Sequence, residues 1–221
     1  EVVTSVAPGP AGRAMVGWGG IASLVVDQAD GRVLAEGPLK AVENAYGLPH
    51  GWHHRETASE GPDPLRARRW LLSAAASTGL ASGALDAVVR HAKDRELFGR
   101  TLSSFQAVQL RLAESVVLLE GAEHLVRDAA WRLTRDEPHA EVSAALAWLY
   151  TAPSVKTACA HAHQVFGALG FATETGLYRF TSQATWLRLA TPVKPAARYV
   201  TASRAKTAGT PPSLVLQGFR P

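Results

Sequence analysis

Apolar and small side chains recur at steps of three and four residues along most of the chain, which is the spacing of one face of an α-helix. The first such run predicts a helix from about Leu65 to Glu96. Its predicted buried face is Leu71, Ala75, Thr78, Ser82, Leu85, Val89 and Ala92. The second run is the most regular, with the face Val108, Leu112, Ser115, Leu119, Ala122, Val126, Ala129 and Leu133. Because the first face consists mostly of small side chains, we expect neighbouring helices to pack closely against it.

Two further helical segments follow a break that ends at Pro138. A third helix is expected over about His139–Phe166, in which Pro153 should introduce a kink and Gly167 a terminating turn. A fourth, more interrupted helical region is expected over about Leu177–Ala205. Four helices joined by short loops predict a mainly α fold, an up-and-down four-helix bundle.

The segment before residue 64 has a different composition, rich in Gly, Val, His and turn-forming residues. Ile21–Val26 and Arg32–Leu34 flank the turn Asp30–Gly31 as two short strands would. Two prolines then punctuate the chain before the helical spacing begins. We therefore expect a small β region over residues 1–63 and a helical bundle domain over residues 64–221.

Composition limits the classes of function. The 221 residues are 47% hydrophobic with a formal net charge of +4, and the arginines are scattered, so we expect no nucleic-acid partner. No uninterrupted apolar run is long enough to cross a membrane and no signal peptide is visible, so we expect a soluble protein without a membrane span. The single Cys159 cannot form an internal disulfide, which favours a reducing compartment and a cytoplasmic location.

The loop between the first two predicted helices contains the most informative motif. It reads Arg95, Glu96, Leu97, Phe98, Gly99, followed by Phe105 and Gln106. An arginine at a helix C-terminus is commonly placed there by the helix dipole, so Arg95 alone says little. The whole string resembles the R-x-x-F-G motif and following glutamine of the acyl-CoA dehydrogenase family. The resemblance implies contact with the FAD of a neighbouring subunit, in which the Arg95 guanidinium faces the pyrophosphate. The residues implied are Arg95, Phe98, Phe105 and Gln106.

A second motif follows the third predicted helix. Residues Gln164–Glu174 read Q-V-F-G-A-L-G-F-A-T-E. This string resembles the family's Q-x-F-G-G-x-G-F-x-x-E signature, with Ala168 in place of one glycine. The resemblance implies that the backbone approaches the adenosine diphosphate half of FAD at Gln164, Gly167 and Ala168. Glycine has no side chain and so lets FAD come close to the backbone. We expect the methyl group of Ala168 to restrict this contact without abolishing it.

The family's reaction needs a general base, and neither of its two base positions holds one here. In the family, a glutamate removes the α proton of an acyl-CoA thioester while FAD N5 takes the β hydride. Matching the motifs places Thr191 at one base position and Arg69 at the other. Neither a threonine hydroxyl nor an arginine can serve as a base near neutral pH. Four other carboxylates fit better as surface acids: Glu56, Glu60, Asp63 and Glu174.

These residues favour one subunit of a heteromeric acyl-CoA dehydrogenase. The resemblance implies that this chain lends FAD-binding loops to a shared site, while a catalytic partner subunit supplies the glutamate and binds the acyl-CoA substrate. Unequal pairs in the family act on bulky acyl chains such as sterol side chains, and the activity needs an electron-transfer acceptor. The β region resembles the end of the family's middle domain in position only, and the family's amino-terminal helical domain is not represented.

Two alternatives stay open. A noncatalytic structural or regulatory bundle subunit that has lost flavin binding would explain Thr191, Val193 and Ala168, but it leaves Arg95 and Gln106 unexplained. A metal site could be imagined from the histidines, but their spacing is not that of ligands and no carboxylate or cysteine completes a set. The histidines concerned are His50, His53, His54, His161 and His163. We therefore expect no metal.

Overall fold

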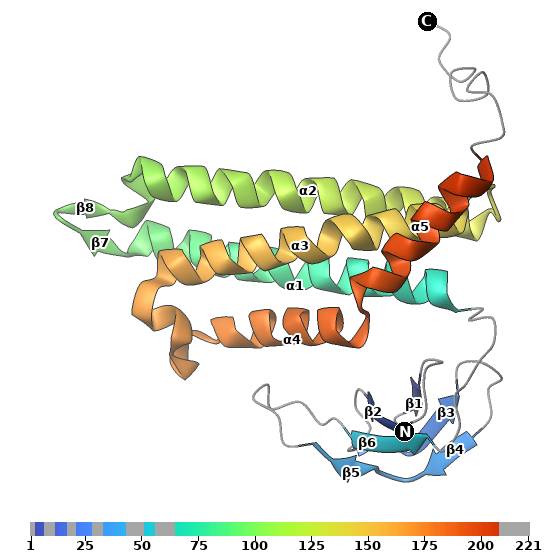
Figure 1. The fold of residues 1–221 in the computed structure, drawn as a ribbon. Helices are drawn as coiled ribbons and strands as arrows, with labels where there is room; N and C mark the ends of the chain where they lie inside the picture. The colour runs from blue at the N-terminus through green and yellow to red at the C-terminus, as the bar shows by residue number, and fades with distance from the viewer. Residues whose placement is uncertain are drawn as a thin grey trace, which may run out of the picture.

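Five α-helices make up most of the described chain in the computed structural model (Figure 1). The structure describes residues 3–6, 12–16, 21–27, 33–42, 51–55 and 65–207. The helices are α1 (Arg66–Asp94), α2 (Gln106–Thr134), α3 (Ala140–Phe166), α4 (Leu177–Ala190) and α5 (Val193–Thr207). The predicted mainly α fold, a helical bundle preceded by a small β region, is confirmed.

The fourth predicted helical region divides into α4 and α5 at Thr191 and Pro192. Thr191 has φ −123° and ψ 79°, which is not helical. A proline ring clashes with a helical conformation of the preceding residue, and Pro192 has no N–H with which to continue α4. The chain therefore turns here, and α5 packs back against α3.

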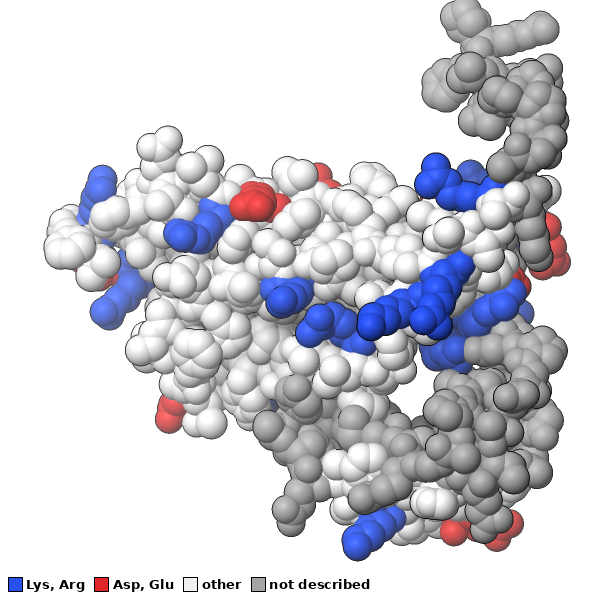
Figure 2. All heavy atoms as spheres, viewed as in Figure 1, with Lys and Arg blue, Asp and Glu red and all other residues white. Residues whose placement is uncertain are grey.

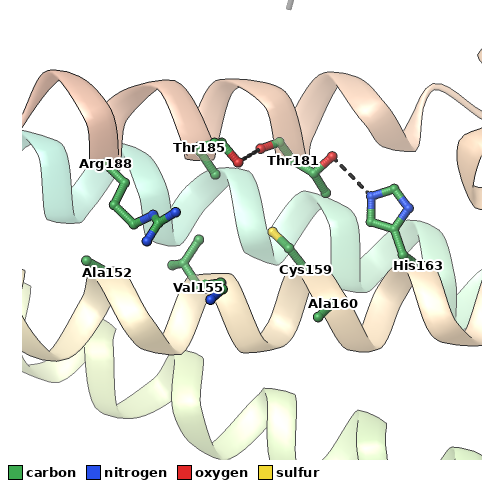
Figure 3. Close-up of a pocket in the computed structure, with 10 residues that line it drawn as sticks. Ala152, Val155, Cys159, Ala160, His163, Thr181, Thr185 and Arg188 are labelled. Carbon is green, nitrogen blue, oxygen red and sulfur yellow. Dashed lines mark hydrogen bonds between the residues drawn. The ribbon is translucent and has the colours of Figure 1, made fainter. Parts of the chain in front are cut away.

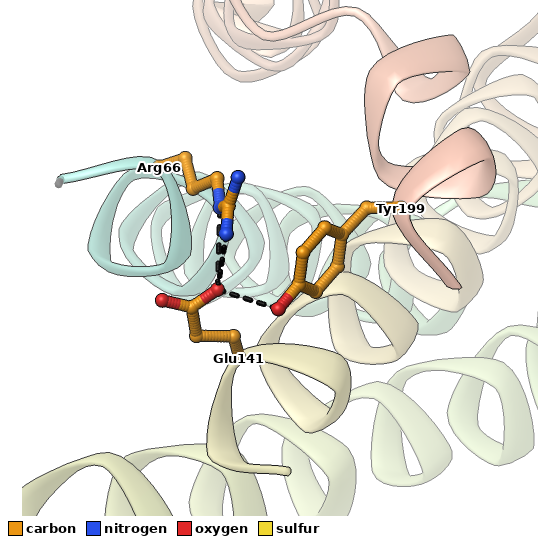
Figure 4. Close-up of polar contacts among 3 residues, drawn as sticks. All are labelled: Arg66, Glu141 and Tyr199. Atoms are coloured by element: carbon orange, nitrogen blue, oxygen red, sulfur yellow. Dashed lines mark hydrogen bonds and ion pairs between the residues drawn. The ribbon is translucent and has the colours of Figure 1, made fainter. Parts of the chain in front are cut away.

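A polar cluster fixes α5 to two other helices (Figure 4). Arg66 Nη2 donates a hydrogen bond to Glu141 Oε2 at 2.7 Å, and the Tyr199 hydroxyl donates to the same oxygen at 2.6 Å. The Arg66 guanidinium carbon also lies 4.3 Å from the centroid of the Tyr199 ring. These residues belong to α1, α3 and α5, so one carboxylate joins three helices.

The buried face predicted for α2 is confirmed, whereas that predicted for α1 is displaced. The buried residues of α2 all belong to the predicted face: Ser115, Leu119, Ala122 and Ala129. Only Thr78 and Ala92 of the predicted α1 face are buried. The buried positions of α1 are Ala67, Trp70, Ser73, Ala74, Ser77, Thr78, Ala81, Ala84, Val88 and Ala92. Because α1 packs against α2, α3 and α4, its buried surface is wider than one stripe. Most of its buried residues lie one position before a residue of the predicted face.

The described part of the β region forms two three-stranded sheets, ordered β1-β3-β4 and β2-β6-β5. The strands are β1 (Val3–Val6), β2 (Gly12–Val16), β3 (Leu24–Asp27), β4 (Val33–Glu36), β5 (Lys40–Ala41) and β6 (Gly51–Arg55). β3 and β4 pair antiparallel, which confirms the two strands predicted around residues 21–34. The turn at Asp30–Gly31 lies outside the described residues. The domain boundary near Asp63 remains a prediction.

α1 meets the length and composition criteria of a membrane span. It has 29 residues, and its most apolar 18-residue window has a mean hydropathy of 1.3 and is 39% buried in the structure. The run is not uninterrupted, because Ser, Thr, Gly and Asp residues divide it. A core helix of a bundle meets the same criteria, and α1 packs against α2, α3 and α4. These criteria alone therefore say little about a membrane.

Candidate functional site

The first predicted FAD-contacting segment begins where α1 ends. The helix stops at Asp94, rather than at the predicted Glu96, because Arg95 has an extended backbone with φ −81° and ψ 124°. The carbonyl of Arg95 accepts a hydrogen bond from the Leu102 N–H at 2.7 Å, which closes the loop on itself. The Arg95 side chain is exposed and therefore available to a ligand.

A hairpin tip at Phe98 and Gly99 follows, between β7 (Glu96–Leu97) and β8 (Arg100–Thr101). Both tip residues have positive φ, 51° for Phe98 and 74° for Gly99. Glycine adopts this conformation readily, whereas a phenylalanine does so only with strain. Phe98 is also 87% exposed. A strained, exposed aromatic residue adds nothing to the core of this chain, so it is suited to contact with another molecule.

Phe105 and Gln106 lie where the hairpin returns to α2. The Arg100 guanidinium carbon is 3.9 Å from the centroid of the Phe105 ring, a cation–π contact that ties the hairpin to the start of α2. Gln106 is the first residue of α2 and is exposed. No side chain caps this helix, so its first N–H groups are available to an acceptor. An uncapped helix N-terminus beside arginines suits an anionic group.

The second predicted segment follows α3 as two short 3₁₀ turns, η3 (Gly167–Phe171) and η4 (Thr173–Thr175). Gly167 ends α3 with φ 62° and ψ −139°, a conformation that essentially only glycine adopts. The terminating turn predicted at Gly167 is therefore confirmed. A Cβ added to Gly167 would meet no atom within 4 Å, and both Gln164 and Ala168 are exposed. The backbone of this loop is thus open to close approach by another molecule.

The two segments meet at the same end of the bundle, at the left in Figure 1. His91 in the last turn of α1 stacks on Phe166 in the last turn of α3, with ring centroids 4.3 Å apart and an interplanar angle of 18°. Burial lowers the pKa of His91, and the neighbouring Arg95 lowers it further. The imidazole is therefore neutral at pH 7, and the positive charge at this point belongs to Arg95.

Thr191, at the first base position, is a buried junction residue. Its hydroxyl lies 2.8 Å from Ser73 Oγ, and its carbonyl accepts a hydrogen bond from Trp148 Nε1 at 2.9 Å. Thr191 is 5% exposed and Trp148 is 0% exposed. These bonds join the end of α4 to α1 and α3. The side chain at the family's base position is thus used to hold helices together.

Arg69, at the second base position, is half-buried in the first turn of α1. It precedes Ser73 by one helical turn, so it lies on the same part of α1 as the partner of Thr191. From Arg69 to Arg95 the helix rises about 39 Å, at roughly 1.5 Å per residue. In this chain the base positions and the loops predicted to contact FAD are therefore at opposite ends of the bundle.

The histidines near the second loop face different helices. His161 Nδ1 lies 3.1 Å from Ser115 Oγ on α2, whereas His163 Nε2 lies 3.1 Å from Thr181 Oγ1 on α4. Within the described ranges, no group of three or more His, Cys, Asp or Glu side chains could hold a metal ion. Glu174 is exposed. Four other residues considered from the sequence lie outside the described part of the chain: His50, Glu56, Glu60 and Asp63.

Sequence reasoning did not find Ser73 and Trp148, the two residues that bond to Thr191. The available signal was weak. Ser73 is a hydroxyl residue within an apolar stretch of α1, and a buried hydroxyl needs a hydrogen-bond partner. The partner itself is distant in the sequence, so spacing does not reveal it.

Comparison with known proteins decides which family has this bundle and these loops. The family model described as "Acyl-CoA dehydrogenase, C-terminal domain" matches residues 64–191, more than half of the chain. The chain belongs to the acyl-CoA dehydrogenase family. The matched region contains both loops and both base positions, and FAD is the cofactor of this family.

Individual acyl-CoA dehydrogenase relatives agree with this assignment. The probable acyl-CoA dehydrogenase YngJ of Bacillus subtilis is 35% identical over 116 residues, which cover 52% of this chain and 30% of YngJ. The ChsE4-ChsE5 complex from Mycobacterium tuberculosis matches with a TM-score of 0.73 and 22% identity, over 94% of this chain and 64% of that chain. A variant of the Tcur3481-Tcur3483 steroid ACAD matches with a TM-score of 0.77 and 20% identity, over 94% and 63%. The two structural matches show the fold, and the chain spans less than two thirds of each relative.

Proposed function

We propose that this chain is the FAD-holding, base-lacking subunit of a heteromeric acyl-CoA dehydrogenase. Its two loops hold part of an FAD that is shared with a partner subunit. The partner binds the acyl-CoA thioester and supplies the glutamate that removes the α proton. Bound FAD supplies the acceptor for the β hydride. An external electron-transfer acceptor completes the turnover.

The observation that carries the proposal is the buried position of Thr191. A general base must reach the substrate and must be deprotonated near neutral pH. Thr191 is buried and its hydroxyl is bonded to Ser73, whereas residue 69 is an arginine, a side chain that offers no proton acceptor. These two observations support our proposal that a carboxylate of another chain takes the α proton.

The loop residues fit one end of a dinucleotide. Arg95 is exposed, and a guanidinium offers several donors in a fixed plane to a pyrophosphate. The uncapped start of α2 at Gln106 adds backbone N–H groups and the positive end of a helix dipole. The open space beside Gly167 permits a close approach to the second loop. These residues bind and orient the cofactor, and none of them handles the α proton.

The same loops expose apolar side chains that this chain does not bury. Phe98 and Phe171 are 87% and 77% exposed, and the adjacent Leu97 and Leu169 are 41% and 46% exposed. Apolar side chains grouped in this way are typical of interaction sites. We infer that a partner subunit covers this end of the bundle, as a cofactor bound between two chains requires.

Two structural relatives favour an unequal pair and a bulky substrate. The ChsE4-ChsE5 complex is named for two chains, and the Tcur3481-Tcur3483 protein is described as a steroid ACAD. By analogy with these proteins, the acyl group at the partner's site would be bulky or sterol-derived. This part of the proposal rests on likeness of fold and not on a residue of the described chain.

Flavin content tests the proposal. The full chain is coexpressed with the acyl-CoA dehydrogenase chain that copurifies with it, and the visible spectrum of the assembly is recorded. We expect a flavin spectrum, and we expect Arg95→Gln to weaken FAD binding roughly 10- to 100-fold, because a hydrogen bond between charged groups is lost. Arg90→Gln is the matched control, since Arg90 is exposed on α1 but precedes the loop. Equal flavin retention in both variants would contradict the role of Arg95.

A noncatalytic bundle subunit is the second candidate. It is favoured by Ala168 at a glycine position of the family motif, and by Thr191 at the base position. The exposed Arg95 and Gln106 are unexplained by it. A colourless assembly that still forms with a defined stoichiometry would favour this second candidate over FAD binding.

A further inference from the structure

A pocket of about 270 Å³ lies between α3 and α4 (Figure 3). None of the residues predicted to contact FAD lines it, and neither base position does. Its walls come from successive turns of the facing surfaces of the two helices. The pocket is therefore separate from the site described above.

The pocket has a cationic end and a neutral polar end. In Figure 3, Arg188 lies toward Ala152, whereas Thr181 lies opposite His163. Lys156 also lines the pocket, one helical turn after Ala152 on α3. Thr181 Oγ1 and His163 Nε2 are 3.1 Å apart and bond to each other, and the Thr181 hydroxyl also donates to the Tyr178 carbonyl. The charged donors for a ligand are the two cations at the opposite end.

Neither cation, Lys156 nor Arg188, has an acidic partner among the residues that the structure describes. Residues 140–207 contain seven Lys and Arg residues but only two acidic residues, Glu141 and Glu174. Figure 2 shows a row of Lys and Arg side chains across the middle of the viewed face. This distribution favours an anion in the pocket.

The middle of the pocket is apolar. Val155, Ala160 and Ala184 line it, together with Cys159. Burial raises the pKa of the Cys159 thiol to about 11, so this side chain is neutral at pH 7 and behaves as a small apolar group. Among the described residues that line the pocket there is no Phe, Tyr or Trp to stack on a nucleobase. The middle therefore suits an aliphatic group.

We propose that this pocket binds a small aliphatic carboxylate. The carboxylate lies between Lys156 and Arg188, and the alkyl chain runs past Cys159 toward His163. A volume of about 270 Å³ equals the space of roughly nine water molecules, which suits a medium chain such as octanoate. Such a ligand is a free acid and not a CoA thioester, so the site is distinct from the substrate site of the family.

Calorimetric titration of the full chain tests the proposal. Octanoate should bind saturably at one site per chain. Octanol, which has the alkyl chain without the charge, should bind roughly tenfold or more weakly, because charge-assisted hydrogen bonds are absent. Inorganic phosphate, which has the charge without the chain, should also bind more weakly. Equal affinity for octanoate and octanol would overturn the proposal, as would no binding of octanoate.

Two variants test separately the charge that binds the carboxylate and the volume that holds the alkyl chain. Arg188 and Ala160 line the pocket but are exposed, so substitutions there should leave the fold intact, which circular dichroism can check. Arg188→Gln should weaken octanoate binding roughly tenfold, and Ala160→Leu should abolish it by filling the pocket. Arg179→Gln is the control, since Arg179 is an exposed cation of α4 outside the pocket. Unchanged binding in Arg188→Gln would overturn the proposal, as would a pocket filled by a partner's side chain in the assembly.

Discussion

Most members of the family have a glutamate base at the position of Thr191. In this chain the position has a short side chain that is hydrogen-bonded within the bundle. A carboxylate placed there would lose the bond to Ser73 and would bring a charge into a site that is 5% exposed. Burying an unpaired charge costs several kcal/mol, so the junction would have to open to accept it. Reintroducing a glutamate at residue 191 is therefore not expected to restore a base by itself.

Removing the Thr191 hydroxyl should affect stability and not the chemical step. Thr191→Val leaves the buried Ser73 hydroxyl without its partner, which should lower the free energy of unfolding by about 1–3 kcal/mol. Thr201→Val is the control, because Thr201 is exposed and its hydroxyl bonds to the Ala197 carbonyl of its own helix. Urea unfolding measures both variants. A specific loss of turnover in the folded Thr191→Val assembly would show that Thr191 takes part in the reaction after all.

Sequence alone could identify Thr191 as the residue at the base position, but not its structural role. The bond to Ser73 spans 118 positions and the bond from Trp148 spans 43. Such contacts depend on how the helices are arranged in space, which residue type and local spacing do not encode. The motif residues could be predicted from the sequence because each motif is a short, continuous segment.

Among the elements, α1 and α4 are in tight contact where Phe180 of α4 lies against Gly83 of α1. A Cβ added to Gly83 would lie 2.6 Å from Phe180 Cε1, whereas a Cβ on Gly79, one turn earlier, would meet no atom within 4 Å. Alanine stabilises a helix interior relative to glycine, so Gly79→Ala should raise the free energy of unfolding by about 0.5–1 kcal/mol. Gly83→Ala should instead lower it by about 1–3 kcal/mol, because the Phe180 ring must move. Equal stabilisation by both variants, measured by denaturant unfolding, would contradict this close contact.

Glu141 joins α1, α3 and α5, and its contribution should depend on pH. Burial alone would raise the pKa of its carboxyl, but the hydrogen bonds from Tyr199 and Arg66 outweigh burial and lower it. The carboxylate therefore stabilises the fold fully above its usual pKa of 4.5, and this contribution is lost as the pH falls through the lowered value. Glu141→Gln should cost about 0.5–1 kcal/mol at pH 7, because solvent screens a pair that is more than a third exposed.

The control for Glu141 is Glu123→Gln on α2. Glu123 pairs with Arg127 one turn away on the same helix, and both side chains are at least half exposed. Its loss should cost about 0.3 kcal/mol. The difference between Glu141→Gln and the wild type should narrow below pH 4.5 in urea unfolding. A difference that stays constant down to pH 3 would show that the charge of Glu141 does not contribute.

Hydrophobic spacing predicts an element's buried face only when one side of that element is covered. The predicted α2 face is correct because the residues that α2 buries lie along a single stripe. The predicted α1 face is displaced because three other helices cover α1. The last helical region divides in two because Pro192 prevents a helical conformation at Thr191. Hydrophobic periodicity alone does not predict this break, although the proline is visible in the sequence.

At the scale of the whole molecule, the loops and the base positions lie at opposite ends of one bundle. Their separation of about 39 Å along α1 follows from helix geometry. The two FAD-related motifs share an end because α1 and α3 both run toward it and α2 runs back (Figure 1). The shared site that we propose combines two chains, one giving its loops and the other giving its base.

The most direct test of the central claim is acyl-CoA-dependent bleaching of the flavin under anaerobic conditions. The full chain alone, supplied with excess FAD, is compared with the assembly that contains its acyl-CoA dehydrogenase partner. We predict that an acyl-CoA thioester bleaches the flavin of the assembly and leaves the spectrum of the isolated chain with FAD unchanged. Bleaching by the isolated chain at the rate of the assembly would contradict the claim that its base comes from a partner.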